Sequence, residues 1–345
     1  MTLRRLGFLA ADHLPVPDRL LAASISVLCE RTRRELAKAP PSATADFVAA
    51  MGRRPIAVHT DAANAQHYEL PPEFFALVLG PHRKYSSCLY APDNDAPGDS
   101  LATAEARALA ETCDHAGLAD GQDILELGCG WGSLSLWMAA RYPGANITAV
   151  SNSRPQREFI EAEAARRGLR NLRIITADMN SFDPEARFDR IVSVEMFEHM
   201  SNWHDLLGRV RGWLRRDGRL FLHVFSHRST PYSFETEDKS DWIAQHFFTG
   251  GIMPSHAMVR QYGDLFAVEQ DWRWDGTHYQ RTALDWLANF DRNRAAVMRV
   301  LTGVYGAEAP KWARRWRIFF LATAGLFGHD RGHEWAVSHY RLRPM

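Results

Sequence analysis

The chain has 345 residues, 46% of them hydrophobic and 24% charged, and its 41 basic side chains balance its 41 acidic ones. This composition is typical of a globular protein, and the zero net charge argues against a nucleic-acid partner, which needs a basic excess. The four cysteines (Cys29, Cys88, Cys113, Cys129) form no C-x-x-C pair. We therefore expect neither disulfides nor a metal site, and a cytoplasmic location. The longest apolar run, 318–327, is about half a membrane span, so stable membrane insertion is not expected.

Residues 17–40 are predicted to be helical, because apolar side chains such as Leu20, Leu21, Ile25 and Leu28 recur with helical spacing. The Pro- and Ser-rich stretch that begins at Pro40 breaks this helix.

Strands and helices alternate between residues 100 and 228. The predicted strands are 124–127, 147–150, 172–176, 191–194 and 220–225, and the predicted helices are 134–141, 155–167 and 203–214. Such alternation is typical of an α/β protein with a parallel sheet covered by helices on both faces. Ligands of such sheets bind outside the carboxyl ends of the strands.

The regular alternation stops after residue 228. Residues 229–262 are rich in aromatic and turn residues, and a strand at 266–274, helices at 285–301 and 311–327, and a final strand at 335–340 are predicted after them. With the two late strands added to the five earlier ones, the sheet is expected to have seven strands. A segment inserted between late strands lies above the ligand edge, so a lid over a second substrate is expected; a helical decoration that only stabilises the core is the alternative.

A glycine-rich turn follows the first strand of the core. The strand ends at Glu126, and Gly128, Gly130 and Gly132 come next, before a helix. Glycines allow a sharp turn and let a ligand approach the backbone. The spacing G-x-G-x-G behind an acidic residue differs from the G-x-G-x-x-G of dinucleotide enzymes, and it favours S-adenosylmethionine (SAM) over NAD. A turn without any ligand is the alternative.

The second and third strands end in further candidates for the cofactor site. No acid follows the second strand, which departs from most SAM enzymes, so Ser151, Asn152 and Gln156 are expected to hydrogen-bond the ribose. Asp178 suits the amino group of adenine, with Met179 beside it. Helix capping near residue 153 and a solvated Asp178 are the simpler alternatives.

Three ionisable residues, Glu195, Glu198 and His199, follow the fourth strand, where an acceptor would meet a methyl donor. Methyl transfer to nitrogen needs a neutral lone pair and usually a base; a carboxylate can hold the ammonium form, and a histidine can take its proton. These residues are therefore the catalytic candidates, with Glu198 orienting His199. A helix-capping Glu198 and a core histidine are the alternative.

Several segments, in order, resemble coclaurine N-methyltransferase-like proteins of the cyclopropane-fatty-acyl-phospholipid synthase family. The segments are His67–Pro71, Lys84–Cys88, Leu125–Ser133, Val150–Ser153, Phe188–Ile191, Glu195–Met200, Phe247–Gly251, His278–Tyr279 and Glu334–Trp335. The resemblance covers roughly residues 65–340. It implies a Rossmann-like class I SAM-dependent methyltransferase, with 1–99 as a helical extension and cofactor-covering segment, 100–228 as the core, 229–301 as the lid and 302–345 as the closing helix and strand.

The resemblance also implies roles for single residues. Tyr85 and Ser86 would close over the methionine end of SAM. Glu195 would face the amine, whereas fatty-acid cyclopropane synthases have glycine there. Phe248 and Trp335 would form aromatic walls of the acceptor pocket.

The cyclopropane synthases, by the same resemblance, hold a bicarbonate base. Their pocket corresponds to Ser87, Glu198, His223, Phe225 and Tyr279, with Ser87 in place of a cysteine and Phe225 in place of an isoleucine. His223 and Tyr279 are thus further acceptor-site candidates.

The sequence favours an N-methyltransferase acting on a small aryl, alkyl or cyclic amine. Two alternatives stay open: methyl or methylene transfer to an unsaturated acyl chain, and a non-catalytic SAM-binding protein. The number of subunits is also open, with a homodimer among the options.

Overall fold

The computed structural model describes residues 16–58, 70–92, 99–234 and 245–345. A seven-stranded sheet forms its centre, with the strand order β3-β2-β1-β4-β5-β9-β8. The strands are β1 (Asp123–Leu127), β2 (Asn146–Ser151), β3 (Leu172–Thr176), β4 (Phe188–Val194), β5 (Leu214–His227), β8 (Phe266–Trp274) and β9 (Trp335–Pro344). Strands β1 to β5 are parallel, while β9 runs antiparallel to both β5 and β8. The predicted mostly parallel seven-stranded sheet is confirmed.

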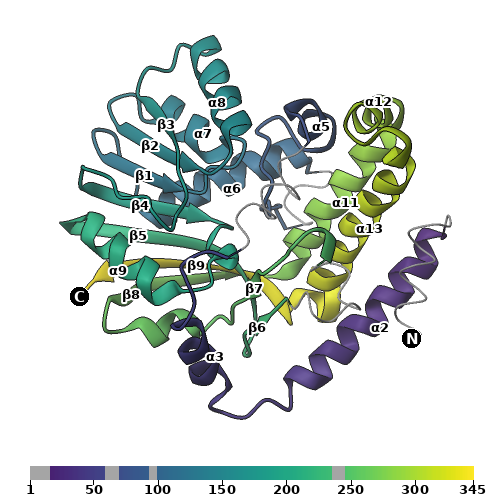
Figure 1. The fold of residues 1–345 in the computed structure, drawn as a ribbon, viewed down its shortest axis with the longest axis horizontal. Coiled ribbons are helices and arrows are strands. Elements are labelled where there is room, and N and C mark those ends of the chain that lie inside the picture. Colours follow the sequence, from purple (N-terminus) through teal and green to yellow (C-terminus); the bar gives the residue numbers. More distant parts are fainter. Residues whose placement is uncertain (1–15, 59–69, 93–98, 235–244) are drawn as a thin grey trace.

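Helices cover the sheet and extend beyond one end of it (Figure 1). The α-helices are α2 (Asp18–Leu36), α3 (Ala43–Met51), α5 (Pro72–Val78), α6 (Leu101–Ala116), α7 (Ser133–Arg141), α8 (Arg154–Arg166), α9 (Trp203–Trp213), α11 (Gly276–Arg292), α12 (Arg294–Tyr305) and α13 (Ala309–Gly328). Short 3₁₀ helices lie at Phe197–His199, Met258–Tyr262, Gly306–Glu308 and His329–Gly332, and a small hairpin pairs β6 (Tyr232–Ser233) with β7 (Ile252–Met253).

The alternation of side chains along the strands explains the two helical layers. Leu125 of β1 and Ile191 of β4 pack with α9 in one core cluster. Their chain neighbours Ile124 and Val192 face the other way and pack with α6 and α7. Successive side chains of a strand point to opposite faces, so a sheet whose strands are apolar throughout must be covered on both sides.

A third core cluster joins α2, α5, α11, α12 and α13 beside the sheet, where Figure 1 shows α2 lying along α13. Phe74 of α5 and Trp316 of α13 belong to it, with ring centroids 4.7 Å apart. This helical layer faces the carboxyl ends of the parallel strands. The chain order reverses there between β1 and β4, which is where open α/β sheets bind ligands.

The prediction of one helix over 285–301 is wrong. Helix α11 begins at Gly276, where the side chain of Asp275 accepts the Thr277 amide at 2.9 Å, and it ends at Arg292. Asn293 interrupts the helix because it leaves helical geometry (φ −95°, ψ 15°) and its Nδ2 donates to the Leu77 carbonyl at 2.7 Å. Helix α12 then begins at Arg294. The contact that breaks the helix joins positions 216 residues apart, so a local pattern does not reveal it.

Candidate functional site

The glycine turn after β1 has three positive φ angles: 79° at Gly128, 50° at Gly130 and 78° at Gly132. A Cβ on Gly128 would lie 2.6 Å from Met196, and one on Gly132 would lie 2.7 Å from Ile160. Packing therefore requires glycine at these two positions. A Cβ on Gly130 would meet no atom of the described chain within 4 Å. Gly130 thus presents bare backbone to the two cavities that it lines.

The smaller cavity, of about 80 Å³, lies at the ends of β1, β2 and β3, and Ser151, Asn152, Asp178 and Met179 line it. Ser151 Oγ donates to Gln156 Oε1 at 2.6 Å. Gln156 is buried, and its Nε2 has no hydrogen-bond partner within the described ranges. Because Gln156 lines both cavities, this amide is a donor available to a ligand. The five ribose and adenine candidates therefore share one recess.

The larger cavity, of about 470 Å³, lies between the carboxyl ends of β1 and β4 and the helical layer. Its polar wall includes Glu126, Glu195 and His199. Aromatic side chains form much of the remainder: Tyr85, Trp131, Phe225, Tyr232, Phe234, Phe248, Tyr279, Trp286, Phe319 and Phe327. Such a cavity suits an apolar, ring-bearing molecule that carries a single polar group.

Glu126 is the next-to-last residue of β1 and is buried, with the hydroxyl of Ser135 donating to its carboxyl group. Burial raises the pKa of Glu126 to about 7. The carboxyl group lies on the cavity wall next to the glycine turn.

Residues 84–91 form a segment that reaches the cavity through Lys84, Tyr85 and Ser86. Lys84 is buried, and its Nζ donates to Ser86 Oγ at 2.5 Å and to the Ser87 carbonyl at 2.6 Å. Burial lowers the pKa of Lys84. The segment is therefore held by a buried cation at its cavity end.

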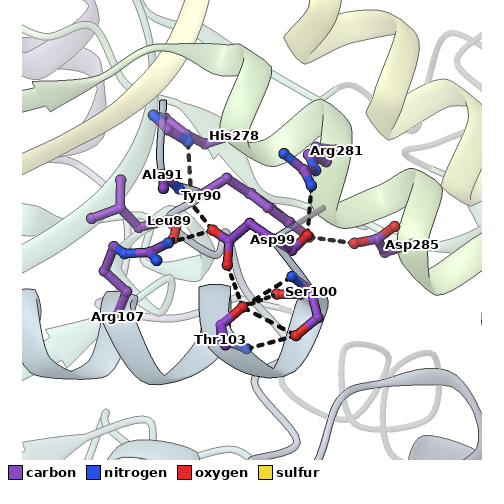
Figure 2. A network of polar contacts seen from close by, with 10 residues as sticks. All are labelled: Leu89, Tyr90, Ala91, Asp99, Ser100, Thr103, Arg107, His278, Arg281 and Asp285. Atoms are coloured by element: carbon purple, nitrogen blue, oxygen red, sulfur yellow. Dashed lines mark hydrogen bonds and ion pairs between the residues drawn. The ribbon is translucent and has the colours of Figure 1, made fainter. Parts of the chain in front are cut away.

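The other end of this segment is anchored between α6 and α11 (Figure 2). Tyr90 OH donates to Asp285 of α11 at 2.8 Å, and the Tyr90 amide donates to His278 Nδ1 at 3.2 Å. Arg107 of α6 donates to the Leu89 carbonyl at 2.9 Å and pairs with Asp99 at 2.6 Å. These contacts fix the position from which Tyr85 enters the cavity.

Glu195 lies directly after β4 with φ at 48°, a left-handed conformation that is uncommon for a non-glycine residue. Three groups compensate for this backbone strain. The Ser87 amide donates to Oε1 at 3.0 Å, Tyr279 OH donates to Oε2 at 2.7 Å, and His223 Nε2 lies 3.2 Å from Oε1. Burial raises the pKa of Glu195, and the nearby charge of Lys84 partly opposes this.

Glu198 and His199 lie in the 3₁₀ turn after Glu195. Glu198 is buried, and its Oε1 accepts the Phe225 amide at 2.7 Å, which ties the turn to β5. Its Oε2 has no hydrogen-bond partner among the residues that the structure describes. Burial, reinforced by Glu195, raises the pKa of Glu198 well above its usual value. His199 lines both cavities, and its ring lies 4.5 Å from that of Phe248. His199 therefore lies where the two cavities meet.

The sequence profile of mycolic acid cyclopropane synthetases matches residues 58–332. The chain belongs to this family. An (S)-coclaurine N-methyltransferase from Thalictrum flavum subsp. glaucum is 35% identical over 82% of this chain and 79% of its own length. The cyclopropane-fatty-acyl-phospholipid synthase of Escherichia coli (strain K12) is 30% identical over 79% of this chain and 66% of its own length. The predicted resemblance is thereby confirmed.

The fold agrees with that of solved members of the family. The crystal structure of coclaurine N-methyltransferase bound to N-methylheliamine and SAH superposes with a TM-score of 0.90 at 31% identity, covering 99% of this chain and 97% of that one. The cyclopropane synthase MmaA2 from Mycobacterium tuberculosis has a TM-score of 0.69 at 24% identity, covering 84% of this chain and 99% of that one. The class I SAM-dependent methyltransferase fold is confirmed.

The residues of this family member fit SAM. Three features lie on the larger cavity: the open approach to Gly130, and Gln156 Nε2 and the buried Ser133 Oγ, neither of which has a hydrogen-bond partner in the described part of the chain. Two unsatisfied donors beside exposed backbone are what a polar cofactor would use.

Two acceptor candidates lie behind the cavity wall instead of on it. His223 is buried beneath Glu195, and Trp335 is buried with its Nε1 donating to the hydroxyl of Tyr232 at 3.1 Å. Tyr232 lines the cavity, whereas His223 and Trp335 do not. Trp335 therefore supports a wall residue, because β9 lies inside the sheet. Residues 67–69 of the resembling segments lie outside the described residues.

Helix α2 supplies wall residues that sequence reasoning missed: Ile25, Leu28, Cys29 and Thr32. The helical periodicity indicated an apolar face but not what it covers. Lys84 was also missed as a site residue, although it begins one of the resembling segments. Nothing in the sequence indicated that the Lys84 side chain is buried, since lysine side chains are usually exposed.

Proposed function

We propose that this protein is a SAM-dependent N-methyltransferase of a small amine with an aryl or cyclic scaffold. The relatives that support this include coclaurine, pavine and tetrahydroprotoberberine N-methyltransferases, at 30–35% identity. The aromatic cavity of about 470 Å³ has room for such a molecule. No helix among the described residues is long and apolar enough to cross a membrane. The cytoplasmic location and the homodimer stay predictions.

One observation carries the choice of an amine: the carboxylate of Glu195 takes the hydrogen bonds of the bicarbonate pocket. By the resemblance, the lipid enzymes have glycine at this position and hold bicarbonate with groups that correspond to Ser87, His223 and Tyr279. Here each of these three contacts a Glu195 oxygen, at 3.0, 3.2 and 2.7 Å. These three groups are therefore already engaged and not free to hold a bicarbonate ion, and a fixed negative group lies on the cavity wall.

A fixed carboxylate suits an ammonium group. An ammonium ion entering this aromatic cavity loses its hydration, and a buried charge is tolerated only when it is paired. Glu195 is the partner we assign, with the aromatic walls offering faces for the cation. An acyl double bond gains nothing from the same carboxylate.

The chemistry divides between the cofactor and the chain. When bound, SAM supplies an electrophilic methyl group. Glu195 holds the amine, the segment at Tyr85 and Ser86 closes the site, and the cavity walls exclude water and align the nitrogen. His199, at the junction of the cavities, accepts the proton that the nitrogen must lose, with Glu198 holding its turn in place.

Labelled SAM and a panel of aryl-ethylamines, cyclic amines and unsaturated phospholipids test the proposal. We expect label in the amines and little or none in lipid. Glu195→Gly removes the built-in carboxylate and the backbone strain, so amine use should fall while bicarbonate begins to raise the melting temperature. Methylated or cyclopropanated lipid with no amine product would overturn the proposal in favour of the lipid enzymes. If the protein binds SAM but methylates no substrate in the panel, it is the non-catalytic SAM-binding alternative. The presence of Glu198 and His199 at the site argues against this alternative.

A further inference from the structure

Three buried histidines form a continuous hydrogen-bonded chain beneath Glu195. His223 Nε2 lies 3.2 Å from Glu195 Oε1, and its Nδ1 lies 2.8 Å from His339 Nε2. His339 Nδ1 lies 2.8 Å from His115 Nδ1, and His115 Nε2 lies 3.0 Å from Glu111 Oε1. Both nitrogens of every ring are used. This histidine chain links the end of β4 to β5, β9 and α6, and it runs from the cavity wall to the surface.

The inner part of this histidine chain is buried, and its outer end reaches solvent. His223 and His339 are fully buried, and His115 is 8% exposed. The ring of His115 stacks on Trp272, with centroids 3.8 Å apart and planes 10° apart. The side chain of Glu111 is 41% exposed. Water therefore meets the chain at Glu111.

Proton counting shows that this chain can carry one proton by transfer within its own contacts, after which the rings must rotate before it carries another. Four contacts link the three rings and the two carboxyl groups, so four protons complete them. Three neutral imidazoles supply three protons, and a protonated Glu195 supplies the fourth. If each proton crosses to the acceptor in its own contact, Glu195 is left ionised and Glu111 is left protonated. Glu111 then releases its proton to water.

The electrostatics suit neutral rings. Burial lowers the pKa of His223 and of His339, and Lys84 and the neighbouring histidines lower them further. Burial lowers the pKa of His115 as well, although Glu111 and Asp114 oppose this. Arg341 also lies near His115 and lowers its pKa. Neutral rings pass protons on instead of storing a charge.

We propose that Glu195, His223, His339, His115 and Glu111 conduct one proton of the ammonium substrate from the closed site to the solvent. The proposal rests on the proposed N-methyltransferase function. In that reaction the ammonium group first gives a proton to Glu195, and the N–H electron pair becomes the nitrogen lone pair. This pair forms the new N–C bond while the S–C electron pair stays on sulfur, and the remaining proton of the methylated nitrogen goes to His199. The histidine chain carries the proton on Glu195 to Glu111. Each ring is then left as the other tautomer, and rotation of the three rings returns the chain to its starting state for the next turnover.

His339→Gln tests the middle of the chain, because an amide can hydrogen-bond there but does not relay protons. We expect turnover at saturating substrate to fall by about tenfold or more, as for other proton-transfer groups. SAM affinity and the amine KM should stay unchanged. A pH indicator in stopped flow should show solvent protons appearing later than methylated product, a delay that a merely structural role does not produce.

His115→Gly tests the outer end of the histidine chain. This variant should fold more readily than His339→Gln, because His115 lies in the last turn of α6, next to the partly exposed Glu111. It leaves a ring-sized space beside Trp272, so added imidazole should restore turnover. The matched control is His256→Gln. His256 bonds Ser338 Oγ at 2.8 Å and Asp271 Oδ2 at 3.0 Å but contacts no member of the chain in these bonds, and its loss should leave turnover unchanged.

A second measurement is independent of activity. In protein labelled with ¹⁵N-histidine, Glu195→Gln should shift the ring nitrogens of His115, two rings away, because a change at one end reorders the tautomers of the whole chain. Unshifted His115 resonances would overturn the proposal even if no amine were a substrate. Wild-type turnover with no proton delay in folded His339→Gln protein would overturn it as well. A wild type that methylates no amine while His115 does respond would count against the proposed function and not against the chain.

Discussion

Replacing Glu195 by glutamine removes one negative charge and changes little else. Glutamine has the same size, and its Oε1 can still accept the Ser87 amide, which now lies 3.0 Å from the carboxylate. The amide nitrogen then takes the place of Oε2 and donates to the Tyr279 hydroxyl, which reverses the direction of that hydrogen bond. We therefore expect Glu195→Gln to fold and to bind SAM as the wild type does.

The expected loss follows from the burial of this charge. The Glu195 side chain is only 9% exposed, and removing one partner of a buried ion pair costs about 3–5 kcal/mol. Lys84, Ser87 and Tyr279 already share the charge of the carboxylate, so we take the lower end. At about 1.36 kcal/mol per factor of ten, about 3 kcal/mol corresponds to a loss of roughly 150-fold in amine kcat/KM.

The assay is steady-state transfer of labelled methyl to the best amine of the panel, with calorimetric SAM binding alongside. Asp123→Asn is the control, because it removes a carboxylate paired with Arg215 at the amino end of β1, away from the cavity. It should leave both quantities unchanged. A folded Glu195→Gln variant with wild-type amine kcat/KM would refute the reasoning, and an equal loss of SAM affinity would mean that Glu195 holds the cofactor instead.

Three further predictions address other parts of the site. Gly130→Ala places a methyl group in the open cavity and should lower SAM affinity by about tenfold or more, as measured by calorimetry. The control is Gly168→Ala, which also has a positive φ (71°) and open space, so its melting temperature and SAM affinity report the backbone cost alone. Equal SAM affinities of the two variants would contradict the cofactor placement. His199→Ala should lower kcat by about 10²–10⁴-fold with the fold intact by circular dichroism, and full activity at saturating substrate would exclude it as the base. Burial raises the pKa of Glu126 from 4.5 to about 7, so its proton stabilises the folded state fully below pH 4.5 and this contribution is lost as the pH rises through about 7. The melting temperature of the wild type relative to Glu126→Gln should therefore fall between pH 4.5 and 7 and level off above, and parallel curves would contradict this.

The local pattern of the chain predicted the core well. The alternation of apolar runs located β1 to β4 within a few residues, because buried parallel strands are apolar throughout and the helices between them have helical periodicity. Strand β5 begins earlier than predicted, at Leu214 instead of residue 220. The helix at 285–301 was wrong because a tertiary hydrogen bond from Asn293 to Leu77 breaks it. Patterns within a segment do not report contacts with distant segments.

The sequence by itself determined the glycine turn, the acidic residue before it and the family, since each depends on short runs of consecutive residues. Only the tertiary structure decided that three groups converge on Glu195, because they come from positions 87, 223 and 279. The same holds for the histidine chain, whose rings lie on α6, β5 and β9. Hydrogen bonds between side chains depend on the register of neighbouring strands and on the packing of a helix against them, and neither has a signature in a single stretch of sequence.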